Sequence, residues 1–243
     1  MKKHLIETGM AVLMVLCFYI LSREAAETAG KLVNVSGNIK EEKVILVDAG
    51  HGGADSGMVG VDGLKEKGIN LEISVKLKKV LEKRGYTILM TREEDKGLYE
   101  ENTKNMKAQD LQNRIAMIKE YKPLLAVSIH QNSFTEEKYR GAQVFYYGPS
   151  ERSRGLAASI QQALIEFQDP DNTRQEKANE DYYLLRKETV PTVICECGFM
   201  SNAAEEALLK SEMYQEKTAW AISVGIVRYL NGSTEKGDIE HDR

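Results

Sequence analysis

Two patterns of hydrophobic positions recur from residue 44 to residue 230: short continuous apolar runs, and apolar residues at helical spacing. Val44–Val47 (VILV) is apolar at every position, which is typical of a strand that is buried on both faces. Asn70–Arg84 instead carries apolar residues at helical spacing, and Gly85 marks its carboxyl end. The further predicted elements are strands at 86–90, 124–129, 143–147, 182–185 and 192–195, and helices at 108–121, 154–167, 203–209 and 213–230.

This alternation of strands and helices predicts an α/β fold. We expect a single layered domain over residues 43–231, with a mostly parallel twisted sheet and helices on both faces. In sheets of this kind, ligands bind beyond the carboxyl ends of the strands. A functional site is therefore expected at that edge of the sheet.

The two ends of the chain differ from this domain. Residues 1–22 begin with positive charge and contain the apolar run Met10–Leu21, which suits the core of a signal peptide and is short for a full membrane span. No small-residue cleavage site follows, so an uncleaved anchor that contacts the membrane stays open. Residues 23–42 are predicted to be a polar linker, and residues 232–243 a polar, disordered tail.

Composition narrows the classes of function. The formal net charge of −4 argues against nucleic acid or an anionic membrane surface as the main partner. Three cysteines are too few for a disulfide framework. Cys195 and Cys197 share one face of a predicted strand, where core packing is favoured over a metal or redox role.

Polar side chains follow the predicted buried strands at their carboxyl ends. His51 and His130 both occupy such positions, and two imidazoles with one carboxylate make a catalytic zinc site with an open fourth position. Glu66, just before the first helix, is the best third ligand. The alternatives are a capping histidine in a glycine-rich turn and a carboxylate that the helix dipole favours.

Glu196 closes an apolar strand, where a charged side chain needs a partner. Three roles are open from the residues alone. It can be a fourth metal ligand, a general base for a metal-bound water, or the partner of Arg92 or Arg114 in a salt bridge.

Several motifs occur together along the chain. They are VDAGHGGADSG at 47–57, EKGINL at 66–71, Thr91-Arg92, Asn113-Arg114, SIHQNS at 128–133 and ECGFMSN at 196–202. In this order they resemble the zinc-dependent N-acetylmuramoyl-L-alanine amidases, the family called amidase type 3. The chain departs from the family pattern at Gly68, Gln131 and Cys197.

The resemblance implies that His51, Glu66 and His130 bind one Zn²⁺ per chain and that Glu196 is the catalytic carboxylate. It also implies a reaction, hydrolysis of the amide between N-acetylmuramic acid and the L-alanine of the stem peptide. The partner is then the peptidoglycan glycan strand with its stem peptides.

A narrower likeness is to the spore-cortex amidases of endospore formers. It is carried by HQNSF at 130–134, AQVFYY at 142–147, DYYLLR at 181–186 and ICECGF at 194–199. It implies a role in forming muramic-δ-lactam, with a functional link to a muramic acid deacetylase. It also implies an exported protein at the outer face of the membrane or in the wall, between forespore and mother cell. Any accessory protein is left open.

Three other functions compete with this interpretation. A zinc peptidase would cut within the stem peptide, and a non-catalytic protein would only bind the wall. A Rossmann-type nucleotide binder needs a phosphate loop, and Gly50-x-Gly52-Gly53 lacks the required spacing.

Overall fold

The computed structural model describes residues 43–240, with side chains as far as Gly232. The predicted signal segment and linker, and the last three residues, lie outside the described residues. No helix within the described part of the chain is long and apolar enough to cross a membrane. Because the predicted signal segment and linker lie outside the described residues, the boundaries proposed for the terminal segments stay predictions.

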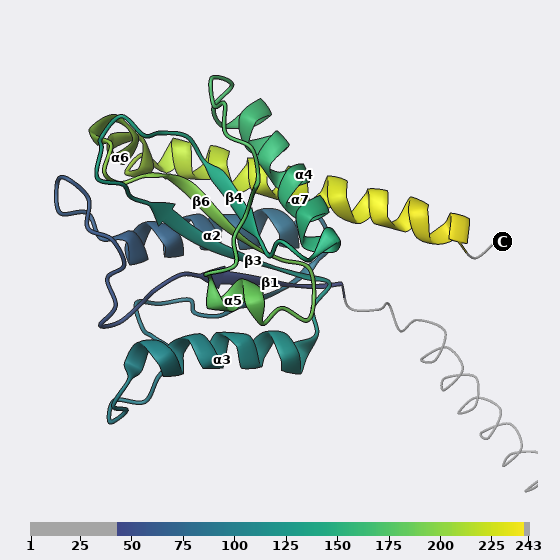
Figure 1. Cartoon of the computed structure of the whole chain (residues 1–243), viewed down its shortest axis with the longest axis horizontal. Coiled ribbons are helices and arrows are strands. Elements are labelled where there is room, and N and C mark those ends of the chain that lie inside the picture. Colours follow the sequence, from purple (N-terminus) through teal and green to yellow (C-terminus); the bar gives the residue numbers. More distant parts are fainter. Residues whose placement is uncertain (1–42, 241–243) are drawn as a thin grey trace, which may run out of the picture. The chain divides into compact units, whose positions relative to one another are not determined.

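The sheet has six strands, of which four are parallel to one another. They are β1 (Val44–Ala49), β2 (Thr87–Met90), β3 (Leu125–Asn132), β4 (Gln143–Tyr146), β5 (Lys177–Ala178) and β6 (Thr192–Phe199). Their order is β2-β1-β3-β6-β4-β5, as the central strands of Figure 1 illustrate. The pairs β2-β1, β1-β3 and β3-β6 are parallel, whereas β4 runs antiparallel to β6. The predicted, mostly parallel sheet is confirmed.

Helices cover both faces of the sheet, as predicted (Figure 1). The helices are α2 (Glu66–Glu82), α3 (Met106–Tyr121), α4 (Glu151–Phe167), α5 (Tyr183–Arg186), α6 (Ala203–Leu209) and α7 (Glu212–Glu240). Helices α2, α4 and α7 pack on one face, and α3 and α5 pack on the other.

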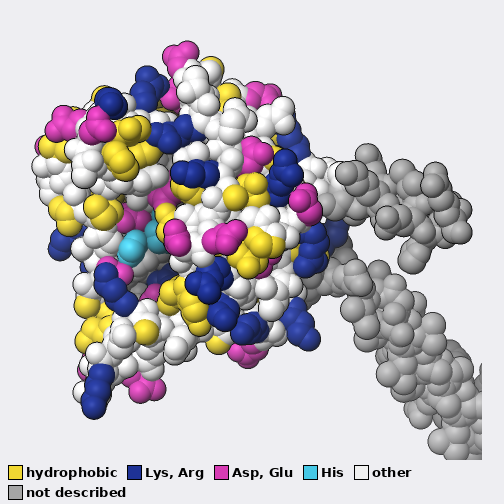
Figure 2. All heavy atoms as spheres, viewed as in Figure 1, with side chains coloured by type: hydrophobic (Ala, Val, Ile, Leu, Met, Phe, Trp, Pro, Cys, Tyr) yellow, Lys and Arg dark blue, Asp and Glu magenta, His cyan; other side chains and the backbone are white. Residues whose placement is uncertain are grey.

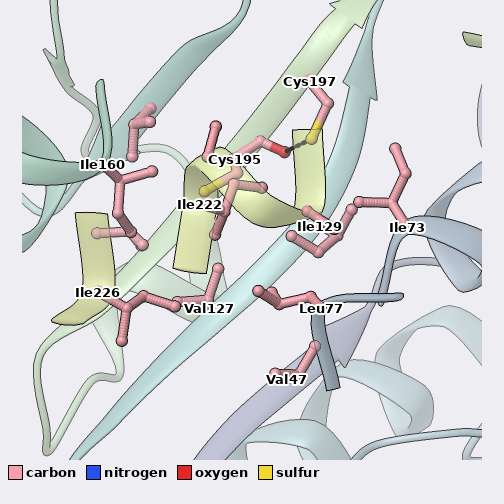
Figure 3. Close-up of a cluster of buried hydrophobic side chains, with 14 of the residues drawn as sticks. Val47, Ile73, Leu77, Val127, Ile129, Ile160, Cys195, Cys197, Ile222 and Ile226 are labelled. Carbon is pink, nitrogen blue, oxygen red and sulfur yellow. Dashed lines mark hydrogen bonds between the residues drawn. The ribbon is translucent and has the colours of Figure 1, made fainter. Parts of the chain in front are cut away.

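The larger core lies between the sheet and helices α2, α4 and α7. Figure 3 shows its centre, formed by Val47, Val127, Ile129 and Cys195 from the strands and Ile73, Leu77, Ile160, Ile222 and Ile226 from the helices. Each fully buried aliphatic side chain contributes about 1.5–3 kcal/mol. Cys195 and Cys197 are completely buried in this core, so the core-packing interpretation of the two thiols is confirmed.

The prediction of a strand at 182–185 is wrong, because this segment forms the single helical turn α5. The sequence is compatible with either form, and packing decides between them. In the helical turn, Leu184 and Leu185 both enter the second core beside α3. The strand next to β4 is instead β5, which the sequence analysis did not predict.

Several element boundaries also differ from the predicted ones. Helix α2 begins at Glu66 rather than Asn70, which places this carboxylate in its first turn. Strand β6 continues to Phe199. Helix α7 begins at Glu212 and continues to Glu240, beyond the predicted end at residue 230.

Helices α4 and α7 pack in close contact at Gly225, which has no side chain. A Cβ at this position would lie 2.5 Å from Cα and 2.9 Å from N of Ile160. The contact is completed by Ser159, whose hydroxyl donates to the Gly225 carbonyl at 2.8 Å. The backbones therefore have no room to accept a methyl group here.

Gly225→Ala should destabilise the protein, because the added methyl group must force the helices apart. We expect the free energy of unfolding to fall by roughly 1–3 kcal/mol. Gly155→Ala in α4 is the matched control, because its Cβ would meet the Tyr229 ring at an ordinary 3.5 Å. This control should be neutral or gain about 0.5–1 kcal/mol. Urea unfolding measures both, and a Gly225→Ala protein as stable as the control would contradict the crossing.

Candidate metal centre

The parallel strands bring all four predicted site residues to one edge of the sheet. His51 follows the end of β1, Glu66 begins α2, and His130 of β3 pairs in register with Glu196 of β6. All four line a cleft of about 560 Å³. Figure 2 shows histidine side chains at the bottom of a hollow on this face of the molecule.

Three of these residues are arranged as ligands of one ion. Nε2 of His51 lies 3.2 Å from Oε2 of Glu66, and Nδ1 of His130 lies 3.0 Å from Oε1. One ligand atom from each residue lies within 4.8 Å of the others. Bonds to zinc of about 2.1 Å in a tetrahedron separate the ligand atoms by about 3.4 Å. The donor set and its spacing therefore fit a zinc ion.

The Glu66 carboxylate is held in place by donors other than the histidines. Oε2 accepts from the Met58 backbone N–H at 2.8 Å, and Oε1 accepts from the Gln131 N–H at 3.1 Å. The Asn70 amide donates to Oε1 at 3.1 Å and receives a hydrogen bond from the Gln131 side chain. Sequence reasoning missed Asn70 and treated Gln131 only as a departure from the family pattern. Their side chains form a hydrogen-bond network behind the Glu66 carboxylate.

Electrostatics keep the Glu66 carboxyl ionised. Burial raises its pKa, but the adjacent His130 and His51 lower it far below its ordinary value. An ionised carboxylate is the form that binds a metal ion.

Asp55 is a second carboxylate beside His51, which sequence reasoning also missed. Its Oδ2 accepts a hydrogen bond from Nδ1 of His51 at 2.9 Å, and this directs Nε2 toward Glu66. Burial lowers the pKa of the His51 imidazole, but Glu66 and Asp55 raise it to about 9. The two carboxylates beside this imidazole thus favour a positive charge at this place, and a bound metal ion would supply one.

Two glycines leave room for the site. A Cβ on Gly50 would overlap the His130 ring. Gly57 has a positive φ of 65°, and its Cβ would overlap the Glu66 carboxylate and lie 2.7 Å from Cδ2 of His51. Only glycine fits at these close approaches.

Glu196 lies outside the three-residue ligand group and has few partners. It is 6% exposed, and its Oε1 accepts a hydrogen bond from the Tyr182 hydroxyl at 3.2 Å. Oε2 is buried without a hydrogen-bond partner among the described residues. Burial raises the pKa of the carboxyl to about 7; His130 lowers it and Glu66 raises it. A carboxyl with this pKa can both accept and return a proton near neutral pH.

Comparison with known proteins identifies the family. The sequence model of the N-acetylmuramoyl-L-alanine amidases matches residues 45–228. The chain belongs to this family. It is 40% identical over 199 residues to the germination-specific N-acetylmuramoyl-L-alanine amidase of Bacillus subtilis, which covers 81% of this chain and 82% of that protein.

Solved amidase structures share the fold. The CwlD amidase of Clostridioides difficile, in complex with the GerS lipoprotein, superimposes with a TM-score of 0.76 at 43% identity, over 78% of this chain and 98% of that one. The catalytic domain of CwlV from Bacillus (Paenibacillus) polymyxa gives 0.65 at 30% identity, over 78% and 98%. Both the predicted fold and the predicted family are confirmed.

The buried Arg114 binds the backbone of the loop that carries His51 in this amidase. It pairs with Asp48, and its Nε lies 2.5 Å from Oδ2 of Asp110. Its other N–H groups donate to the carbonyl oxygens of Ala49 at 2.9 Å and His51 at 2.8 Å. One guanidinium thus fixes the backbone on both sides of Gly50.

Arg92 acts on the same loop. It donates to the carbonyl oxygens of Ala49 at 2.9 Å and Gly50 at 3.0 Å. Both arginines are therefore engaged away from Glu196, and the salt-bridge interpretation of that glutamate is wrong.

Asp48 is the more deeply buried of the two carboxylates that pair with Arg114. Its carboxylate also accepts hydrogen bonds from Thr91 at 2.7 Å and Ser128 at 2.5 Å. Burial raises the pKa of this carboxyl, but Arg114 and the two hydroxyl groups lower it to about 2.

Asp48→Asn removes the ionisable carboxyl that pairs with Arg114, and with it the pH dependence of this ion pair. Because the pKa is lowered from 3.8 to about 2, the ionised carboxyl stabilises the folded state above pH 3.8 and stops doing so as the pH falls toward 2. The stability advantage over Asp48→Asn should shrink by about 2 kcal/mol between pH 6 and pH 2. Urea unfolding of both proteins with a chelator present measures it. A difference that does not change with pH would contradict the assignment.

Proposed function

We propose that this amidase is zinc-dependent and removes stem peptides from muramic acid during spore-cortex maturation. The observation that carries the proposal is the clustering of His51, Glu66 and His130 beside the buried Glu196. The 40% identity to a germination-specific amidase supports the cortex role.

His51, Glu66 and His130 would hold one zinc ion per chain, because two imidazoles and a carboxylate are ligands that suit zinc. When bound, zinc supplies Lewis acidity toward the amide carbonyl and the attacking water. The surrounding residues orient the ligands: Asp55 accepts a hydrogen bond from His51, and Asn70 donates one to Glu66.

Glu196 is the proposed general base and general acid. Its carboxylate takes a proton from water as the water oxygen attacks the amide carbonyl carbon. The same carboxyl then gives the proton to the leaving nitrogen of L-alanine. Its pKa of about 7 suits both transfers.

The wider role follows from the chemistry and from the relatives. The substrate is peptidoglycan, which lies outside the cytoplasm, and we propose the space between forespore and mother cell as the place of action. A muramic acid deacetylase would act on the stripped sugar so that the lactam can close. The CwlD amidase was solved in complex with the GerS lipoprotein, and we propose an accessory protein for this chain too.

The products of the purified protein test the reaction. An amidase releases stem peptides that begin with a free L-alanine amine and leaves muramic acid with a free lactyl carboxyl. A zinc peptidase would instead leave L-alanine attached to muramic acid. Mass spectrometry of digested peptidoglycan distinguishes these outcomes, and the second would replace the proposed function.

Glu196→Gln and His130→Ala should fail in different ways. Glu196→Gln should keep its zinc and lose turnover by about 10²–10⁴, because it removes only the proton-transfer group. His130→Ala should lose zinc and turnover together. Glu205→Gln is the control, since it replaces a glutamate that is also 6% exposed but lies outside the cleft. It should keep its turnover. Zinc content and amide hydrolysis are measured for each variant, and zinc loss in Glu196→Gln would make Glu196 a ligand.

Deletion of this protein should leave vegetative walls nearly unchanged and alter the spore cortex. The expected change is loss of muramic-δ-lactam, because its formation needs muramic acid without a stem peptide. Muropeptide profiles of purified spores measure it. Unchanged muramic-δ-lactam would exclude the cortex role while leaving the amidase chemistry intact.

A further inference from the structure

The hydroxyl of Tyr182 is directed at the Glu196 carboxylate, and both residues line the cleft. Tyr182 lies just before α5, and its hydroxyl donates to Oε1 of Glu196 at 3.2 Å. Its half-buried ring packs edge-on against Phe145, with centroids 5.7 Å apart. The side chain of Asn179 accepts a hydrogen bond from its backbone N–H at 2.9 Å. The ring and the backbone of Tyr182 are thus both held by contacts that do not involve Glu196.

The two oxygens of the Glu196 carboxylate have different surroundings. Oε1 is bound to the Tyr182 hydroxyl, whereas Oε2 is buried without a hydrogen-bond partner in the described part of the chain. No lysine, arginine or histidine of the described residues forms an ion pair with Glu196. The terminal torsion of a glutamate is broad when nothing constrains it. The tyrosine hydroxyl is therefore the contact that selects one orientation of this carboxylate.

Tyr182 can act in this position only as a donor. Burial and the neighbouring Glu196 both raise the pKa of its hydroxyl, so the proton stays on the tyrosine. Tyr182 therefore does not take the proton from water, which passes to the Glu196 carboxylate.

We propose that Tyr182 is a positioning residue for the amidase reaction: its hydroxyl donates to Oε1 of Glu196 and so holds this carboxylate in one orientation for proton transfer from the attacking water. This inference rests on the proposed role of Glu196. As the water oxygen bonds to the carbonyl carbon, its proton passes to the Glu196 carboxylate. The carbon–nitrogen bond then breaks, the proton passes from Glu196 to the leaving nitrogen, and Tyr182 keeps its own proton throughout.

Tyr182→Phe removes the hydroxyl and keeps the ring against Phe145. We expect kcat to fall roughly tenfold to one hundredfold, as loss of a hydrogen bond to a charged group does, with KM and zinc content unchanged. Tyr214→Phe is the control, because this tyrosine of α7 is also half-buried but lies outside the cleft. It should keep its kcat. A Tyr182→Phe protein with wild-type kcat, or with only KM altered, overturns the inference.

A double-mutant cycle separates positioning from a general effect on the fold. In a Glu196→Gln background the base is already absent, so Tyr182→Phe should cause no further loss of kcat. An equal loss in both backgrounds would show that Tyr182 does not act through Glu196, and would overturn the inference. A wild-type protein that does not cleave the muramic acid amide would instead overturn the proposed function, independently of this ratio.

Discussion

The buried ion pair between Asp48 and Arg114 supports the whole catalytic edge. Burial of two charges is costly unless both are fully hydrogen-bonded. Thr91 and Ser128 complete the partners of Asp48, and Arg114 uses its remaining N–H groups on loop carbonyls. Those carbonyls belong to Ala49, the last residue of β1, and to His51 just beyond it. The pair therefore allows the chain to turn sharply at the point where His51 must face the cleft.

The same cleft gives two glutamates opposite properties. Glu66 receives backbone and amide hydrogen bonds and lies between two histidines, so its pKa is lowered. Glu196 is also buried but accepts only one hydrogen bond, from a hydroxyl group, and its pKa is raised to about 7. Pairs of carboxyls with separated pKa values take different roles in enzymes. Here the environment, and not the residue type, separates a carboxylate suited to a metal from one suited to proton transfer.

Sequence reasoning found what local pattern determines. Continuous apolar runs such as Val44–Val47 predicted the buried strands, and polar residues at strand ends predicted the four site residues. It failed where contacts between distant segments decide the outcome. The turn α5 forms because Leu184 and Leu185 fill a core built by other elements. Asn70 and Asp55 gain their roles only when the loop and α2 are in place.

The proposed partners of Glu196 illustrate the same limit. Opposite charge alone suggested Arg92 or Arg114, but charge does not specify distance or direction. Both guanidinium groups instead bind carbonyl oxygens of the β1 loop, which would otherwise be buried without partners. Their absence from Glu196 leaves its carboxyl free of a cation, which would have lowered its pKa.

The four site residues form two pairs that are held in place in different ways. His130 and Glu196 lie on paired strands in register, so the sheet fixes their separation. A register shift follows at once, between His130 and Asn132, and interrupts the ladder at the cleft before the pairing resumes at Asn132 and Phe199. His51 and Glu66 come from a loop and a helix start, and need the arginines, glycines and Asn70 to meet the sheet residues. A metal bound by His51, Glu66 and His130 would join the two pairs and hold the loop side at a fixed distance from Glu196.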